Sequence, residues 1–276
     1  MRSVFEGTDS LIHEALSLNV GQSLKQKSTC IAIKPFPDVL PRMERLVFDL
    51  FTRIEGNWNG RIPSTMNWRL RKQGDISPHN KNPEILLERA IVILADMGIL
   101  QGWFNQIPVA SGLLDEYSNK RAAIDLVHLS GDCAALIELK WESDNPVYAA
   151  FEILRYGLAF LFCHKMQRNF SYSAYPLMQV KKISLRVLAP YEYYSYCNLD
   201  SLRYALEIAL QRLFHEITKD ALAIDFLFLS FPPQFRLPFQ SGEDVAALKD
   251  MPVEAAPITK LLAAMNSCQR VWQEAI

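Results

Sequence analysis

The chain has 276 residues, of which 50% are hydrophobic and 21% are charged, with only 11 Gly and 15 Pro. These proportions exclude a disordered, collagen-like or low-complexity protein and predict a globular chain with a sizeable core. Lys and Arg total 29 against 30 for Asp and Glu, a net charge of −1. The chain therefore has no global attraction for nucleic acid or for an anionic membrane, and a polyanion would need a local basic patch.

The sequence has no apolar run near its start followed by a cleavage site, and no run of eighteen uncharged apolar residues. We therefore expect a soluble, cytoplasmic protein with no membrane partner. The cysteines are scattered and odd in number, which favours free thiols in a reducing compartment; they are Cys30, Cys133, Cys163, Cys197 and Cys268. Cys133 and Cys163 lie in apolar stretches and are expected to be buried.

Residues 1–82 are expected to form a helical elaboration within one compact unit. Apolar residues recur at helical spacing over 9–26 and 38–55, where the second helix is expected to end at Gly56. The segment 56–81 has no sustained period and is predicted to be a long loop. This basic loop either binds phosphates or is a solvated loop anchored by its two tryptophans. Its candidate substrate-binding residues are Arg69, Arg71 and Lys72.

Residues 83–276 are predicted to form an α/β domain with one mixed sheet flanked by helices. The expected elements are a helix from Pro83 to Gly98, strands 102–110, 121–129 and 133–141, a helix 146–164, a strand 182–189, a helix 200–218, a strand 223–231 and a C-terminal helix 258–272. A tyrosine cluster separates the last strands and is typical of a packed corner, with a base-stacking platform as the alternative; it comprises Tyr191, Tyr193, Tyr194 and Tyr196.

Two acids interrupt apolar strands, where a lone carboxylate is costly: Asp125 and Glu138. If Gly131-Asp132 is a two-residue hairpin loop, counting outward places Asp125 directly opposite Glu138, with Cβ atoms about 5 Å apart. A three-residue loop would shift this register by one. Strand alternation places Lys140 on the same face as Glu138.

Opposed carboxylates repel each other, and a divalent cation resolves the conflict. Carboxylate oxygens suit Mg²⁺, for which Mn²⁺ can substitute, and the Leu139 carbonyl could supply another ligand. Lys140 could orient or activate a water while countering charge on a phosphate. Glu88, on the preceding helix, would be a further acid if that helix packs beside these strands.

Asp125, twelve intervening residues, and then Glu138-Leu139-Lys140 after a helix bearing Glu88 together resemble the PD-(D/E)XK nuclease superfamily. The element order over about residues 83–190 is similar to its restriction-endonuclease-like αβββαβ core. This resemblance implies that Asp125 and Glu138 bind Mg²⁺, that Lys140 assists the attacking water, and that Glu88 positions metal or water.

The next helix resembles the Gln-xxx-Tyr pattern that contacts the substrate backbone in exonuclease-type members. Here the pattern is Glu152-Ile153-Leu154-Arg155-Tyr156, with Glu in place of Gln. By this resemblance Glu152, Arg155 and Tyr156 would contact substrate. The family's Pro before the Asp is replaced by Ile124.

These features predict a metal-dependent nuclease that hydrolyses phosphodiester bonds of nucleic acid, with DNA the expected substrate, as a monomer or a homodimer. The alternative is a catalytically inactive nuclease-fold module that binds nucleic acid or protein. In that case Lys140 would form a structural ion pair with Glu138 or Asp125 without metal.

Overall fold

The computed structural model describes residues 3–19, 22–33, 38–110 and 122–272. Within them one six-stranded mixed sheet has the strand order β1 to β6. The strands are β1 (Trp103–Pro108), β2 (Ala123–Ser130), β3 (Cys133–Leu139), β4 (Lys182–Ala189), β5 (Ala223–Ser230) and β6 (Gln269–Arg270). The first three are antiparallel, β3, β4 and β5 are mutually parallel, and β6 is antiparallel to β5. The predicted α/β class with a mixed sheet is confirmed.

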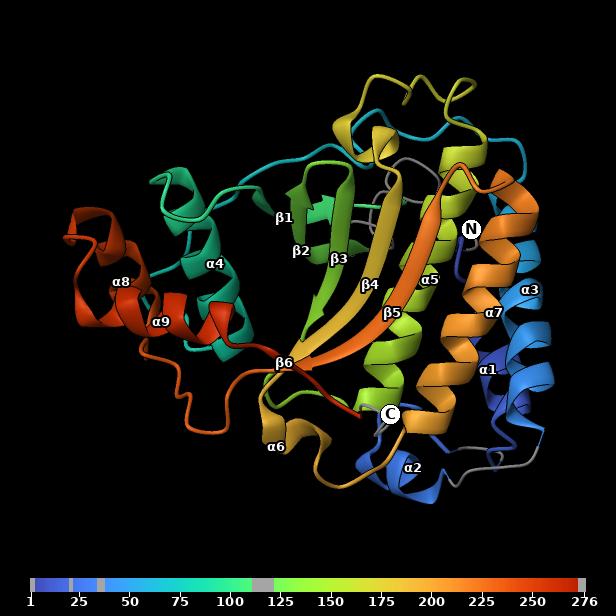
Figure 1. The fold of residues 1–276 in the computed structure, drawn as a ribbon, viewed down its shortest axis with the longest axis horizontal. Coiled ribbons are helices and arrows are strands. Elements are labelled where there is room, and N and C mark those ends of the chain that lie inside the picture. The colour runs from blue at the N-terminus through green and yellow to red at the C-terminus, as the bar shows by residue number, and fades with distance from the viewer. Residues whose placement is uncertain (1–2, 20–21, 34–37, 111–121, 273–276) are drawn as a thin grey trace.

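Helices cover the two faces of the sheet (Figure 1). One layer contains α1 (Thr8–Ala15), α3 (Val39–Trp58), α5 (Pro146–Lys165) and α7 (Asp200–Thr218). The other contains α4 (Pro83–Asp96), α8 (Gly242–Ala246) and α9 (Ala256–Asn266). Two short helices, α2 (Lys27–Ala32) and α6 (Tyr191–Tyr194), lie at the edge toward which β3, β4 and β5 point. Two 3₁₀ turns are formed by Pro176–Gln179 and Ala247–Asp250.

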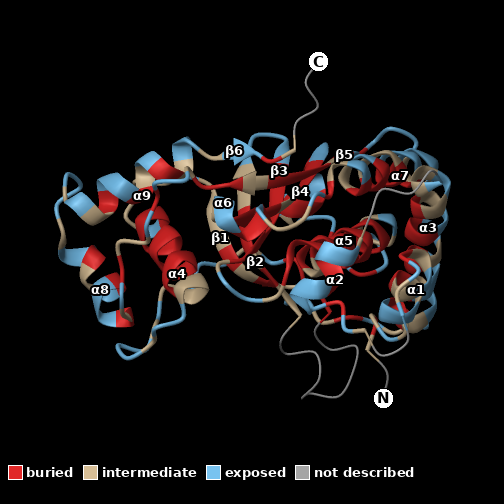
Figure 2. Ribbon diagram, turned by 90° about the horizontal axis from the view of Figure 1, so that it is seen from below, coloured by how far each residue is buried: buried red, intermediate tan, exposed pale blue. Residues whose placement is uncertain are grey.

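The two helical layers bury two hydrophobic clusters, one on each face of the sheet (Figure 2). Strand alternation explains the division, because Leu136 belongs to one cluster and its neighbour Ile137 to the other. The first cluster joins α1 and α3 to α5, α7 and the sheet. Residues 1–82 therefore share a core with the rest of the chain.

Asparagine side chains begin the two helices that flank the central strands. Asn82 Oδ1 accepts hydrogen bonds from the N–H groups of Glu84 and Ile85, and Pro83 occupies the first turn of α4. Asn145 caps α5 in the same way. Its Nδ2 also donates to the carbonyls of Leu24 and Gln26, which ties the N-terminal segment to the start of α5.

Helix α5 is long and apolar enough to cross a membrane by length and composition, but 89% of its most apolar stretch is buried in the protein. It packs against β3 and β4 on one side and α3 and α7 on the other. This burial is consistent with the core helix of a soluble protein.

Three predicted helices have wrong boundaries. The helix expected over 9–26 ends at Ala15, because Ser17 adopts a left-handed φ of 53°. The helix 38–55 continues through Gly56 to Trp58. The C-terminal helix ends at Asn266, because the chain then pairs with β5 as β6.

The expectation of five free thiols is wrong, because Cys30 and Cys197 form a disulfide. The fold brings their Cα atoms to 5.9 Å although 167 positions separate them in the sequence. Cys163 is buried as expected. Cys133 is exposed instead, because it follows the hairpin turn directly at the end of the sheet.

Helix α5 packs against β4 at Gly157, where an added Cβ would lie 2.5 Å from Leu185 Cδ1. Leu185 is fully buried, so its side chain would have to shift within the core. Gly157→Ala should therefore lower the free energy of unfolding by about 1–3 kcal/mol, as overpacking does.

Gly56→Ala is the matched control, because Gly56 is an exposed helical residue with no atom within 4 Å of an added Cβ. This variant should be more stable by about 0.5–1 kcal/mol, the difference in helix propensity. Urea unfolding of both variants tests the packing, and equal effects of the two substitutions would contradict it.

Candidate active site

A lysine surrounded by carboxylates lies where β3 ends. Lys140 Nζ is 2.9 Å from Glu138 Oε1, 3.0 Å from Glu152 Oε2 and 3.6 Å from Asp144 Oδ2. The lysine side chain is only 8% exposed. We call Lys140, Asp125, Glu138, Asp144 and Glu152 the lysine cluster. The sequence anticipated that Glu138 and Lys140 share a face, and it did not anticipate Asp144.

Asp125 joins this cluster through the hairpin register. Ser130 pairs with Cys133 and Leu126 with Ile137, so the two-residue loop is confirmed and the next position in register is Asp125 opposite Glu138. Asp125 Oδ2 accepts a hydrogen bond of 3.0 Å from the Leu139 N–H. The carboxylate is thereby fixed against the end of β3.

The charges of the cluster do not balance. Burial raises the pKa of Asp125 to about 6, although Lys140 opposes this shift. Burial and the charges of Asp125 and Glu152 raise the pKa of Glu138 well above its ordinary value. Burial also acts on Lys140 and Glu152. For Lys140 it is outweighed by the surrounding carboxylates, which raise its pKa, and for Glu152 it is outweighed by Lys140, which lowers its pKa. The lysine stays protonated, and the acids around it need protons or a further cation.

One oxygen of the cluster has no partner. Glu138 Oε2 is buried without a hydrogen bond, and Glu138 as a whole is only 4% exposed. A buried polar oxygen without a partner is costly, and the raised pKa of Glu138 shows that burial disfavours its charged form. Over the described ranges, no three or more His, Cys, Asp or Glu side chains are arranged as a metal site.

Glu88, the further acid predicted on the preceding helix, lies beside the cluster but is held by other groups. Its carboxylate accepts hydrogen bonds from Arg89, from Asn105 Nδ2 at 2.6 Å and from Gln106 Nε2 at 3.0 Å. Burial raises the pKa of Glu88 to about 7, with Arg89 opposing the shift and Asp125 adding to it. The Asp125 carboxylate is therefore close enough to act on Glu88.

Glu84, one helical turn before Glu88, was missed by the sequence analysis. Glu84 Oε1 accepts hydrogen bonds from the Trp141 N–H at 2.8 Å and from Ser143 Oγ at 2.6 Å. It therefore fixes the loop that follows Lys140. The signal in the sequence was the spacing of four residues, which places Glu84 and Glu88 on one face of α4.

The predicted substrate contacts of α5 lie under the N-terminal segment. Arg155 is buried, and its guanidinium contacts Asp9 Oδ1 at 2.7 Å and Thr8 Oγ1 at 3.3 Å. The ring of Tyr156 is buried and packs against Phe5 with centroids 5.7 Å apart. Of these three residues, Glu152 belongs to the lysine cluster, through its contact with Lys140 Nζ.

The basic loop is irregular, as predicted, and its Trp58 and Trp68 are fully buried. Its candidate substrate-binding residues are exposed: Arg69, Arg71 and Lys72. Arg71 Nε donates to the Gln106 carbonyl, and Lys72 Nζ contacts the Ala95 carbonyl and Asp96 at the end of α4. Ala95 is eleven residues from Glu84, about 16 Å along the helix. The Arg69 guanidinium contacts Met66 Sδ. The structure thus brings Arg71 near Glu88 and does not bring Lys72 to the cluster.

Comparison of the chain with protein-family models, with curated proteins and with solved structures finds no significant match. The function must therefore be argued from the geometry of the site.

The raised pKa of Asp125 predicts an unusual dependence of stability on pH. Because its folded pKa of about 6 exceeds its ordinary value of 3.8, this group favours the folded state below pH 4, and that contribution is lost as the pH rises through 6. Asp125→Asn keeps an oxygen for the Leu139 N–H and cannot ionise. The variant should gain stability relative to the wild type from pH 4 to 7, by up to roughly 3 kcal/mol.

Chemical denaturation in EDTA across this pH range measures the difference. Glu216→Gln, on an exposed residue of α7, is the matched control and should follow the wild type. Parallel curves for the wild type and Asp125→Asn would show that Asp125 does not titrate in this way.

Proposed function

We propose that this protein is a metal-dependent nuclease that hydrolyses phosphodiester bonds of nucleic acid, with DNA as the substrate to test first. The observation that carries the proposal is the excess of carboxylates around Lys140. Three carboxylates lie within 3.6 Å of one ammonium group whose side chain is only 8% exposed, and Asp125 lies beside them on the neighbouring strand. Such an arrangement suits a divalent cation and a phosphate better than it suits a self-contained ion pair.

The arrangement of elements supports this proposal. Helix α4, the antiparallel strands β1, β2 and β3, the crossover helix α5 and the parallel strand β4 follow in the order of a restriction-endonuclease-like core. In that core the acids and the lysine lie on the second and third strands, where Asp125, Glu138 and Lys140 are found. The antiparallel hairpin and the parallel crossover together bring Glu152 of α5 to the same point.

The residues present fit a Mg²⁺ ion. Asp125 and Glu138 would hold it, with the Leu139 carbonyl as a further predicted ligand, and Glu138 Oε2 is available because no donor bonds to it. Glu88, the other predicted ligand, is already bonded to Arg89, Asn105 and Gln106 and would lie beside the ion. Mg²⁺ commonly binds through only one or two carboxylates together with waters and substrate phosphates. When bound, such an ion polarises the phosphate and lowers the pKa of a coordinated water.

Lys140 would act as a positioned hydrogen-bond donor. Its raised pKa keeps the ammonium protonated, so it can hold the attacking water and counter the charge of the phosphate but cannot accept a proton. Glu138 and Glu152 fix the ammonium from two directions. Glu152, which replaces the family's Gln, would therefore position Lys140 in addition to any contact with substrate.

A cleavage assay tests the proposal. Purified protein is incubated with plasmid, linear and single-stranded DNA and with RNA, in Mg²⁺, Mn²⁺ or EDTA. Cleavage should require the metal, and Asp125→Ala, Glu138→Ala and Lys140→Ala should each reduce it at least a hundredfold. Removing one preorganised charged group commonly costs that much.

Glu216→Ala is the control for this assay, because Glu216 is exposed on α7 and belongs to no cluster. Its cleavage rate should equal that of the wild type. Cleavage that persists in EDTA or in Asp125→Ala would refute the mechanism.

The contacts of Lys140 also favour a second candidate, a catalytically inactive nuclease-fold module. The predicted structural pair of Lys140 with Glu138 is present, and Arg155 is already occupied by Asp9. On this interpretation the carboxylates are structural partners of the lysine, and the module binds nucleic acid or protein without chemistry.

Thermal unfolding with EDTA and with excess Mn²⁺ separates the two candidates. A metal site gives stabilisation of RT ln(1 + [L]/Kd), about 2.7 kcal/mol at one hundred times Kd, which should vanish in Glu138→Gln. In EDTA that variant should be as stable as the wild type or more stable, because a repelling charge is removed.

A structural ion pair predicts that Glu138→Gln changes the stability in EDTA in the opposite direction. Loss of the Glu138 charge would then destabilise the protein by up to about 3–5 kcal/mol, because it removes a partner from a buried ammonium, and the wild type would not respond to Mn²⁺. That pair of results would overturn the metal site.

A further inference from the structure

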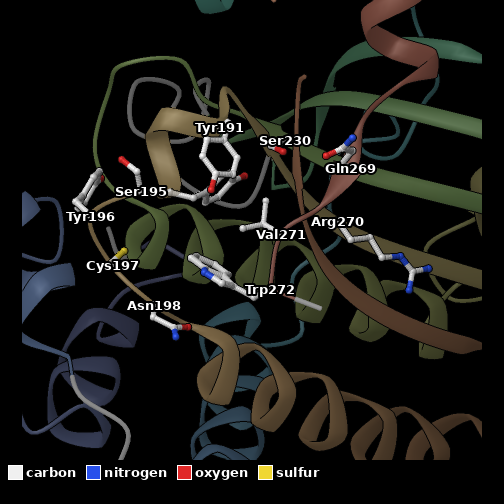
Figure 3. Close-up of a pocket in the computed structure, with 11 residues that line it drawn as sticks. Tyr191, Ser195, Tyr196, Cys197, Asn198, Ser230, Gln269, Arg270, Val271 and Trp272 are labelled. Carbon is white, nitrogen blue, oxygen red and sulfur yellow. The ribbon is translucent and has the colours of Figure 1, made fainter. Parts of the chain in front are cut away.

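A pocket of about 540 Å³ lies outside the carboxyl ends of β4 and β5, between α6 and β6 (Figure 3). Helix α6 directly follows β4, and Ser230, the last residue of β5, lines the pocket. Open α/β sheets bind ligands at this edge. No Asp or Glu is among the described residues that line the pocket, so its lining does not repel an anionic ligand.

Aromatic rings supply two of the walls. Trp272 is held by Tyr194 and Phe228, with ring centroids 5.5 and 5.0 Å away. Tyr191 is 50% exposed, and the figure shows it and Trp272 on either side of Val271. A fixed indole beside an exposed phenol offers stacking surfaces for a flat ring. The tyrosine cluster thus combines a packed corner, made by Tyr193 and Tyr194, with rings that a ligand can reach.

Arg270 lies at the rim of the pocket. It belongs to β6, whose backbone is fixed by pairing with β5 and by the hydrogen bond from the Val271 N–H to the Phe228 carbonyl. Its side chain is exposed, and Figure 3 shows it extending away from Tyr191 and Trp272. Its charge acts on Arg186 of β4, whose pKa is lowered mainly by burial. The phosphate contact of a bound strand is therefore expected at Lys140 and not inside the pocket.

The pocket and the lysine cluster lie at one edge of the sheet. The Lys140 N–H donates to the Leu188 carbonyl of β4, and β4 lies between β3 and β5. Because neighbouring strands are about 4.8 Å apart, the ends of β3 and β5 are about 10 Å apart. A nucleic-acid strand with a phosphate at Lys140 could therefore place a neighbouring nucleotide in the pocket.

We propose that this pocket binds an unstacked base of a single-stranded nucleic acid, with the base against the rings of Tyr191 and Trp272 and a phosphate of the same strand at Lys140. The proposal rests on the proposed nuclease function and assigns it a preference for substrates with unpaired nucleotides near the point of cleavage.

Tryptophan fluorescence in EDTA tests the pocket without catalysis. Titration with thymidine monophosphate and with a short single-stranded oligothymidylate should give saturable quenching that Trp272→Phe abolishes. Tyr191→Ala should weaken binding of the oligonucleotide on the order of tenfold, as loss of one stacking contact does. Tyr204→Ala on α7 and Arg45→Ala on α3, both at exposed residues outside the pocket, are the matched controls and should bind as the wild type does.

Absence of quenching, equal weakening by the control variants, or competition by inorganic phosphate as strong as that by the nucleotide would overturn the base pocket. Quenching that behaves as expected in a protein without cleavage activity would instead sustain the pocket and reject the catalytic proposal. A protein that cleaves but shows no quenching would reject the pocket alone.

Discussion

The ammonium group of Lys140 is the interaction on which the candidate site depends. It lies between Glu138 from its own strand and Glu152 from the helix that follows, so it joins two elements that the chain reaches separately. Without it, carboxylates from β2, β3 and α5 would be buried together with no counter-charge. The positions of Asp125 and Glu138 are set by backbone pairing, and the positive charge of the lysine offsets the repulsion between the carboxylates.

The sheet explains why these charges can be buried at all. Apolar side chains on both faces of β3 anchor it in the two hydrophobic clusters, which fixes the strand up to its last residue. Asp125 accepts a hydrogen bond from the Leu139 N–H where the pairing of β2 with β3 ends, and Glu84 accepts one from the Trp141 N–H just beyond it. The polar groups at the end of the strand are thus satisfied by side chains, which leaves the acids oriented toward the lysine.

Local patterns in the sequence predicted the central part of this arrangement. Alternation along 133–141 placed Glu138 and Lys140 on one face, and the Gly131-Asp132 turn set the register that puts Asp125 opposite Glu138. Glu84 could have been found from its spacing to Glu88. Contacts between distant segments could not be found in this way. The contact between Asp9 and Arg155 depends on where the N-terminal helix packs. Strand β6 forms because β5 offers a free edge to a short segment without strand periodicity.

The disulfide between Cys30 and Cys197 was beyond sequence reasoning for the same reason, and it changes the topology of the molecule. It closes a loop that contains Asp125, Glu138, Lys140 and Glu152, and a loop of this length removes about 5 kcal/mol of chain entropy from the unfolded state. A protease that cut the chain once between the two cysteines would leave two polypeptides still joined by the sulfur atoms. The nicked protein would separate into fragments only after both unfolding and reduction.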